Sequence, residues 1–365
     1  MIALAEVLAR HFPAYEQKFG ARLLPSHRRA VQAILSCRTP TRGGHLYGCR
    51  RCGHLHYQYH SCQHRACPKC GNADASRWLE KQKQRLLPVP YFLVTFTIPE
   101  ELRPLFRSHQ KLCYELLFKE SAASLQDLGA DKKHLGGELG FLGVLHTWTR
   151  QLLYHPHIHY VVAGGALRGD GRRWLRLKNP EFLFPAKVLA LRFRHRLQQA
   201  LQAHPEQFQK ISASVWTKAW NVDLKAVGGG EPTLKYLSAY IFRTALSSAR
   251  VLRDEHDQIT FRYKDGADGQ WKITQVHALE FLRRFLQHIL PKGWQRVRYF
   301  GWFSAPAKRK WQQVLDLLDW RAKAPLPTVL SARPICPQCQ QPLSLLGRLP
   351  RCRSPSTPPN VERAT

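Results

Sequence analysis

The segment YHPHIHYVVAGG, residues 154–165, places three histidines at alternate positions before an apolar run and a pair of glycines. Its β-branched and aromatic residues are typical of a strand. Alternate residues of a strand point to the same face and lie about 6.5 Å apart, so the imidazoles of His157 and His159 can both reach one divalent cation. His155 lies about 13 Å from His159 along the strand, too far to join the same ligand shell.

An isolated histidine in an apolar strand is usually a hydrogen-bonded core residue, and that alternative applies to each of these three. The pair His157 and His159, separated only by the apolar Ile158, favours metal ligation instead. Two imidazoles leave the ligand shell incomplete, so a carboxylate, an amide or another histidine must complete it. The sequence does not rank the candidates, which are Gln151, His146 and Asp223.

Outward from this strand, predicted strands and helices alternate along the chain. Runs rich in β-branched and aromatic residues predict strands at 91–99, 140–148, 214–227, 258–265 and 294–303. Apolar residues at helical spacing predict helices at 73–87, 100–128, 185–204, 231–251 and 276–291. Several connections are too short for parallel crossovers, so the pattern favours an α+β fold with an antiparallel sheet and helices.

Composition changes along the chain predict four consecutive segments. Residues 1–36 are expected to be a helical N-terminal segment, and residues 37–72 a cysteine-rich, zinc-ribbon-like domain. Residues 85–303 are expected to form the catalytic domain. Residues 304–365 are expected to be a basic C-terminal extension whose Pro/Ser/Thr-rich tail is partly disordered.

The charge of the chain predicts a polyanionic partner. Against 25 acidic residues stand 56 lysines and arginines, a net charge of +31 in 365 residues. Such a field attracts a nucleic-acid backbone, although a merely solvated surface or a ribosomal structural role has the same composition. Because no run of eighteen apolar residues and no signal peptide is recognisable, we expect a cytoplasmic, nucleoid-associated protein without a membrane partner.

Ten cysteines in such a chain indicate metal binding rather than disulfides. The pairs Cys49-x-x-Cys52 and Cys67-x-x-Cys70, each followed by glycine, have the spacing of two knuckles that share one tetrahedral Zn²⁺. The alternative, a set of buried free thiols, does not explain two matched pairs in so polar a stretch. Four thiolates leave no open coordination position, so this zinc is expected to be structural.

The other cysteines leave alternatives open. Cys37 and Cys62 either form a second zinc site with nearby histidines or pack beside the first. Cys336-x-x-Cys339 has only Cys352 after it, so it is either a degenerate knuckle or a site completed from elsewhere in the chain.

A predicted helix carries two candidate nucleophiles. Within YLSAYIF, residues 236–242, Tyr236 and Tyr240 are four residues apart and share a helix face. A tyrosine hydroxyl that attacks a phosphodiester forms a covalent phosphotyrosine and keeps the bond energy for rejoining. Lys235 and Arg243 beside them favour a phosphate-facing surface, whereas the alternative is two ordinary packing tyrosines.

Together, these blocks resemble the rolling-circle insertion-sequence transposases of the His-hydrophobe-His (HUH) class that have an N-terminal zinc-binding region. The resemblance covers about residues 1–303 and rests on the C-x-x-C pairs, YHPHIHYVVAGG, YLSAYIFRTAL and the block from EFLRRFL to RYFGW. It implies an HUH-endonuclease-like antiparallel sheet, cleavage of single-stranded DNA with Mg²⁺ or Mn²⁺, and a 5′-phosphotyrosine link.

By position, the resemblance makes His157 and His159 the metal ligands, Tyr240 the principal nucleophile and Tyr236 the second. Two residues depart from the family pattern. Ala239 stands between the tyrosines where a basic residue is common, and Arg150 stands where an amide is common. These departures concern local phosphate contacts and the third metal ligand. Lys235, Arg243 and His155 are expected to contact DNA.

We therefore expect a DNA strand-transferase that carries structural Zn²⁺ and acts on single-stranded element ends. A replication initiator or a relaxase would use the same chemistry. A third alternative is a non-catalytic, zinc-containing nucleic-acid-binding protein whose histidines and tyrosines are structural.

Overall fold

The computed structural model describes residues 2–242, 245–266, 268–321, 334–352 and 362–363. The chain forms two compact units, each assembled from separate stretches. Unit 1 comprises Met1–Asp74, Phe242–Ile289 and Pro325–Thr365, and unit 2 comprises Ala75–Ile241 and Leu290–Ala324. This division differs from the four consecutive segments expected from the sequence, because strand pairing and helix packing join distant stretches within each unit. The tail expected to be disordered lies mostly outside the described residues.

Unit 2 is built on a five-stranded sheet in the order β12-β4-β5-β3-β8, in which every neighbouring pair is antiparallel. Its strands are β3 (Tyr91–Thr97), β4 (Gly140–Trp148), β5 (Tyr154–Ala163), β8 (Val222–Ala226) and β12 (Val297–Gly301). The histidine segment is thus the central strand of the sheet. The α+β class with an antiparallel sheet is confirmed.

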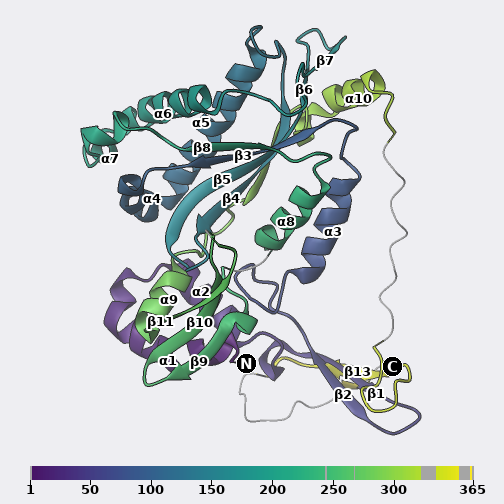
Figure 1. Cartoon of the computed structure of the whole chain (residues 1–365). Helices are drawn as coiled ribbons and strands as arrows, with labels where there is room; N and C mark the ends of the chain where they lie inside the picture. The colour runs from purple at the N-terminus through teal and green to yellow at the C-terminus, as the bar shows by residue number, and fades with distance from the viewer. Residues whose placement is uncertain (1, 243–244, 267, 322–333, 353–361, 364–365) are drawn as a thin grey trace. The chain divides into compact units, whose positions relative to one another are not determined.

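Helices cover both faces of this sheet (Figure 1). On one side lie α5 (Gln110–Ala130) and α6 (Ala186–Gln202), and on the other lie α8 (Glu231–Phe242) and α3 (Asn72–Lys83). Side-chain alternation assigns each strand residue to a face. The fully buried Phe92, Val94 and Phe96 of β3 and Ile158 and Tyr160 of β5 belong to one large apolar core with residues of α5 and α6. The intervening residues of β5, which include His157 and His159, therefore face the side of α8 and α3.

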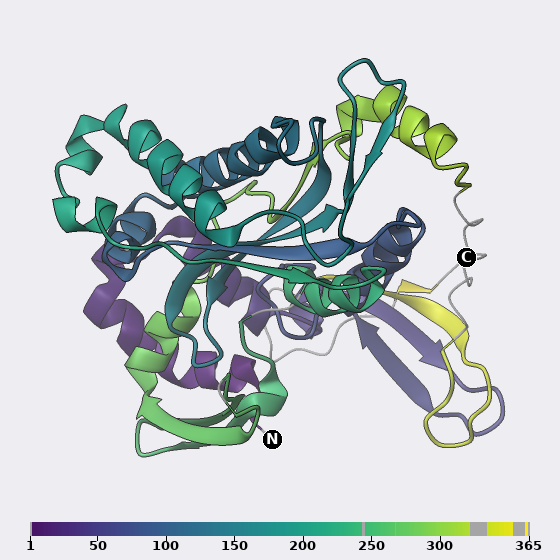
Figure 2. The ribbon, with the colours of Figure 1, turned by 45° about the horizontal axis from the view of Figure 1, so that its top comes forward.

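Smaller elements complete unit 2. They are α4 (Arg103–Ser108), the hairpin of β6 (Gly165–Leu167) and β7 (Trp174–Arg176), α7 (Pro205–Phe208) and α10 (Lys308–Leu317). An ion pair between Lys83 Nζ and Glu231 Oε1, 3.0 Å apart, joins the end of α3 to the first turn of α8. Figure 2 shows α3 and α8 side by side beneath the sheet.

Unit 1 contains two sheets. The first, β9 (Val251–Glu255), β10 (Gln258–Lys264) and β11 (Trp271–His277), is antiparallel. The helices of this unit are α1 (Leu4–Phe19), α2 (Pro25–Leu35) and α9 (Ala278–Leu286). His11 of α1 and Asp254 of β9 form a buried pair with Nε2 and Oδ1 2.7 Å apart, which ties the N-terminal helix to this sheet.

The second sheet of unit 1 joins the two ends of the chain. It has the order β14-β13-β1-β2, with β1 (Gly44–Gly48), β2 (Leu55–Tyr59), β13 (Ser344–Leu349) and β14 (Glu362–Arg363). β13 runs antiparallel to β1, with Ser344 opposite Gly48 and Leu349 opposite Gly44. The zinc-ribbon-like part is therefore built from residues near both termini, whereas the sequence predicted it from residues 37–72 alone.

Within the described part of the chain, no helix combines the length and the apolar character needed to cross a bilayer.

Candidate functional site

Three histidines converge on the face of the unit 2 sheet that is turned toward α8. Their ligating nitrogens, from His146 of β4 and from His157 and His159 of β5, all lie within 4.8 Å of one another. Strand register explains the meeting: His146 is directly opposite His157 in the β4–β5 hairpin, and His159 is two residues further along the same face. The sequence offered His146 as one of three candidate third ligands without ranking them, and the fold places His146 beside His157 and His159.

The other candidate ligands lie elsewhere. Asp223 of β8 and His159 of β5 both pair with Thr95 of the intervening strand β3, so two strand spacings, about 9.6 Å, separate them. The carboxylate of Asp223 instead forms an ion pair with Lys225, with Nζ and Oδ2 3.1 Å apart. Gln151 lies in the turn between β4 and β5.

Hydrogen bonds orient the two histidines of β5. Nδ1 of His157 donates to the backbone carbonyl of His155 over 2.7 Å, and Nδ1 of His159 lies 2.8 Å from Oγ1 of Thr95. A partner on Nδ1 fixes the ring and directs Nε2 away from the strand, as is usual for metal-binding imidazoles. His155 itself is not part of the cluster but supplies this orienting carbonyl.

Burial keeps the three imidazoles neutral. Removal from water lowers the pKa of His146 and of His157 far below the usual histidine value, and lowers the pKa of His159 to about 4. A neutral imidazole is the form that binds a metal. Two nitrogens bonded to one ion at about 2.1 Å are at most about 4.2 Å apart, so small rotations of the rings suffice to place all three on one ion.

The tyrosine helix faces this cluster. In α8, the ring centre of Tyr236 lies 6.4 Å from that of His159, and the two rings are nearly perpendicular. Tyr236 is 44% exposed, so its side chain is accessible to a substrate. Tyr240 follows one turn later in the same helix, where only its backbone is described, and Arg243 lies outside the described residues. Lys235 is exposed beside Tyr236.

Arg296, a residue that the sequence did not single out, bridges the tyrosine helix and the histidine strands. Its Nη1 donates to the backbone carbonyl of Ile241 near the end of α8 over 3.0 Å, and its own carbonyl accepts from the N–H of Leu145 in β4 over 3.0 Å. Its guanidinium lies 5.3 Å from the ring centre of Trp148, which stacks on His146. Arg296 is 9% exposed, so it is a buried cation that fixes the spacing between the two elements.

The cysteines of unit 1 form two groups of four, and these groups differ from the predicted one. Cys37, Cys62, Cys67 and Cys70 form the first, and Cys49, Cys52, Cys336 and Cys339 form the second. The prediction that Cys49, Cys52, Cys67 and Cys70 share one zinc is therefore wrong. The physical reason is the β1–β2 hairpin: Cys49 and Cys52 lie at its turn, whereas Cys62, Cys67 and Cys70 follow β2 at the opposite end, about 17 Å away.

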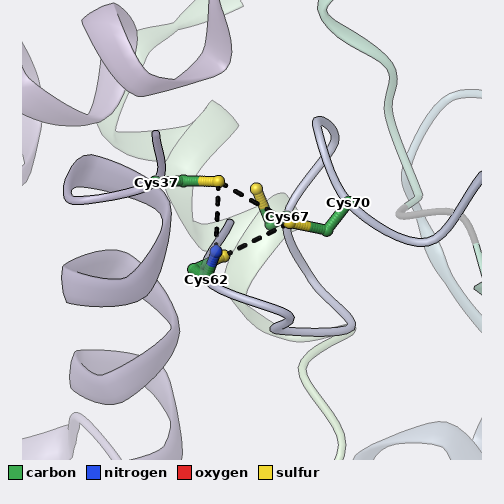
Figure 3. A group of neighbouring side chains, drawn as sticks. All are labelled: Cys37, Cys62, Cys67 and Cys70. Atoms are coloured by element: carbon green, nitrogen blue, oxygen red, sulfur yellow. Dashed lines mark hydrogen bonds between the residues drawn. The ribbon is translucent and has the colours of Figure 1, made fainter. Parts of the chain in front are cut away.

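Figure 3 shows the first group, to which Cys37 contributes from the loop after α2. The Sγ atom of Cys70 is 3.6 Å from those of Cys37 and Cys62. These separations are close to the edge of a zinc–thiolate tetrahedron, about 3.8 Å for bonds of about 2.3 Å. A hydrogen bond from the Cys67 thiol lowers the pKa of Cys62 to about 5, so one thiolate is present to begin metal capture.

The second group pairs two knuckles from opposite ends of the chain. Sγ of Cys49 lies 3.3 Å from that of Cys339, and Sγ of Cys52 lies 3.6 Å from that of Cys336. A backbone hydrogen bond from the N–H of Cys52 lowers the pKa of Cys49 to about 6. The pairing of Ser344 with Gly48 explains the meeting, because it brings the loop before β13 beside the loop after β1.

The two knuckles also have equivalent backbone hydrogen bonds. Gly53 N–H donates to the carbonyl of Cys49, and Gln340 N–H donates to that of Cys336 in the equivalent position. Both turn residues have positive φ, 69° for Gly53 and 60° for Gln340. Glycine adopts this conformation freely, whereas glutamine does so at a cost, which indicates that the fold enforces the second turn. The sequence signal was the C-terminal pair Cys336-x-x-Cys339, and its partner pair could not be identified from spacing.

Comparisons with known proteins agree with these features. The family described as "Putative transposase" matches residues 140–310, and the "Transposase zinc-binding domain" matches residues 7–98. The chain is 35% identical over 371 residues to the putative transposase y4qJ of Sinorhizobium fredii, covering 93% of each chain. It is 28% identical over 291 residues to the transposase for insertion sequence element IS801 of Pseudomonas savastanoi pv. phaseolicola, covering 75% of this chain and 69% of that protein. No solved structure matches the chain.

Proposed function

The chain belongs to the IS91 family of transposases with an N-terminal zinc-binding domain, and we propose that it cleaves and rejoins single-stranded DNA with a tyrosine nucleophile. The observation that carries the proposal is the position of Tyr236. Its exposed phenol ring lies 6.4 Å from the ring of His159, beside three neutral imidazoles. A phosphodiester bound there meets a nucleophile and a metal-binding group together.

His146, His157 and His159 are the residues that would hold the divalent cation. Such an ion, when bound, withdraws electron density from a non-bridging phosphate oxygen and offsets the negative charge that develops during attack. The donor set itself informs the choice of metal, because three imidazoles favour Mn²⁺ over the harder Mg²⁺. The imidazoles provide this site without a carboxylate, so they bring no negative charge against the phosphate.

In the proposed step, the Tyr hydroxyl oxygen bonds to phosphorus and the bond from phosphorus to the 3′ oxygen breaks. The phenol proton passes to solvent, and the leaving oxygen takes up a proton as a free 3′-hydroxyl. The 5′ phosphate remains on the tyrosine. A phenol with its ordinary pKa near 10 is mostly protonated at neutral pH, so a cation held by the three histidines would assist attack by favouring the phenolate.

Both tyrosines of α8 remain candidates for this role. The position of its ring supports Tyr236, which the family resemblance assigned as the second nucleophile. The assignment of Tyr240 as the principal nucleophile stays a prediction, because its side chain is outside the described part of the chain. Lys235, Arg243 and His155 are proposed contacts for the DNA backbone, and the first two flank the tyrosines in the sequence.

The test uses 3′-labelled single-stranded oligonucleotides that tile the DNA on both sides of the coding sequence. The purified full-length protein is incubated with them and Mn²⁺, and products are separated on a denaturing gel. We expect a labelled protein–DNA adduct, because the 3′ fragment keeps the 5′-phosphotyrosine. Peptide mapping of the adduct identifies the linked tyrosine.

Four variants sharpen the result. Tyr236→Phe and Tyr240→Phe are compared singly and together, and Tyr59→Phe, a tyrosine of unit 1, serves as the matched control. An adduct that persists in the double variant would refute the nucleophile proposal. Failure to form any adduct, with salt-sensitive DNA binding intact, would favour the non-catalytic nucleic-acid-binding protein.

A further inference from the structure

The three-stranded sheet of unit 1 has one covered and one open face. Val251, Ile259 and Phe261 are fully buried, and the ring of Phe261 packs 5.7 Å from that of Phe281 in α9. The opposite face carries the alternate residues of β10 and β11. Trp271 is 57% exposed and Ile273 is 66% exposed on it, the two highest values among the large apolar side chains of the described residues.

This open face combines an aromatic ring with positive charge. The guanidinium of Arg262 lies 5.0 Å from the ring centre of Trp271, in a cation–π contact. Strand register places Lys264 opposite Trp271, Arg262 opposite Ile273, and Arg253 opposite Thr260 on the same face. Among the described residues, neither Arg253 nor Arg262 has a carboxylate partner.

Acidic groups are few on this face. Glu255 lies at one end, opposite Gln258, beside the turn that joins β9 to β10. Asp254 points the other way and is buried against His11. Asp265 and Asp268, at the opposite end, are paired with Lys272, whose side chain belongs to the covered face. Among the described residues of β9, β10 and β11, three cations therefore share the open face with one carboxylate.

We propose that the open face of β9–β10–β11, centred on Trp271 and Arg262, binds single-stranded DNA outside the cleavage site. An unpaired base stacks on the Trp271 indole and on Ile273, while Arg253, Arg262 and Lys264 contact phosphates. The proposal rests on the proposed function for the identity of the ligand, and adds to it a second surface for the same strand. None of its residues belongs to the histidine cluster or to the tyrosine helix.

The chemistry of the face favours a single strand over a duplex. Stacking on an exposed indole requires a base whose flat side is open, and in a duplex both sides are covered by neighbouring bases. The arginine beside the ring is placed for the phosphate of the same nucleotide. A shallow, sequence-tolerant surface of this kind suits a protein that must hold a displaced strand rather than read one site.

The test measures binding of the full-length protein to a fluorescein-labelled, mixed-sequence 30-nucleotide DNA by anisotropy, over a range of salt and without added divalent cations. Trp271→Ala is expected to weaken binding about tenfold, in line with the loss of one stacked base. Arg253→Ala with Arg262→Ala is expected to lower the slope of log affinity against log salt by about 1.4, because each phosphate that is no longer neutralised accounts for about 0.7.

Matched variants control for folding and for general charge. Trp271→Phe keeps an aromatic ring and is expected to bind within about threefold of the unmodified protein. Phe182→Ala removes an aromatic side chain of unit 2 that is 50% exposed, and Lys187→Ala removes an exposed cation of α6; both should leave affinity nearly unchanged. Circular dichroism confirms that each variant is folded.

Several outcomes would overturn the proposal. These are affinity within twofold of the unmodified protein in Trp271→Ala, equal losses in the control variants, or a loss confined to duplex DNA or to RNA. If Trp271→Ala converted an oligomer of the protein to a monomer and left its DNA affinity unchanged, the face would instead be a contact between copies of the chain. Adduct formation by the unmodified protein is measured separately, so failure of the nucleophile proposal (no adduct) and failure of this surface (unchanged affinity in Trp271→Ala) are distinguishable.

Discussion

The cysteine groups of unit 1 and the histidine cluster of unit 2 are both arranged for a metal, but in opposite ways. Each cysteine group offers four thiols from loops, and four thiolates close a tetrahedron. The histidine cluster offers three nitrogens from two paired strands in the middle of a sheet, and leaves positions open. In the cysteine groups, metal binding holds the loops in place. In the histidine cluster, the sheet holds the ligands in place before a metal binds.

The largest effect is expected from opening the second cysteine group. Cys336→Ser with Cys339→Ser removes two of four ligands, and the binding free energy of a structural zinc is on the order of 10 kcal/mol. We expect bound zinc to fall from about two ions per chain to about one and the β1–β2–β13 sheet to lose hydrogen-exchange protection. Metal analysis and exchange mass spectrometry measure this.

Cys352→Ser is the control, because Cys352 belongs to neither group of four. It should retain about two zinc ions. Unchanged zinc content in the Cys336, Cys339 variant would show that the second group does not hold a metal.

The next largest effect is expected at the histidine cluster, with the opposite signature. His159→Gln should slow adduct formation on single-stranded DNA at least about 1,000-fold, about 4 kcal/mol, because charge stabilisation at the phosphate is lost. Zinc content should not change. His155→Gln, which alters the neighbouring histidine outside the cluster, should slow the reaction far less, because it keeps the carbonyl that orients His157 and removes only one proposed DNA contact. Equal losses in both variants would contradict the three-histidine site.

A smaller effect is expected at Arg296, which positions the tyrosine helix relative to the histidine strands. Arg296→Gln should slow adduct formation about 10–100-fold, because a small displacement of the nucleophile is costly. Arg296→Lys should restore part of the rate, because a cation can still meet the carbonyl of Ile241. Mn²⁺ affinity, measured by calorimetry, should stay within about threefold, since the ligands are unchanged. A parallel loss of rate and metal affinity would indicate general damage instead.

The smallest effect concerns the choice of metal at the histidine cluster. Because imidazole prefers Mn²⁺ to Mg²⁺, the concentration of Mn²⁺ needed for half-maximal adduct formation should be about tenfold lower than that of Mg²⁺. Brief dialysis against a chelator should abolish the reaction reversibly while thiolate-bound zinc remains. An equal requirement for the two metals would mean that oxygen ligands, not the three imidazoles, dominate the site.

Local pattern was sufficient for the strands and helices that carry the site. The predicted strand 91–99 contains β3 (Tyr91–Thr97), 140–148 and 154–163 are strands, and 231–242 is helical, because their side-chain periodicity is imposed by neighbours in the chain. The pair His157 and His159 was identified for the same reason, since alternation alone places both on one face. The side chains from other elements that complete the histidine and cysteine sites were not identified from local pattern.

The amino-acid sequence by itself determined the α+β class, the two-histidine half of a metal site, the tyrosine pair on one helix face and a strongly basic chain. Those properties depend on spacing within a single element. Only the tertiary structure decided that His146 joins His157, that Cys49 and Cys52 meet Cys336 and Cys339, and that Arg296 reaches α8. These contacts depend on strand register and hairpin geometry, which bring together residues up to 290 positions apart without leaving any trace in local spacing.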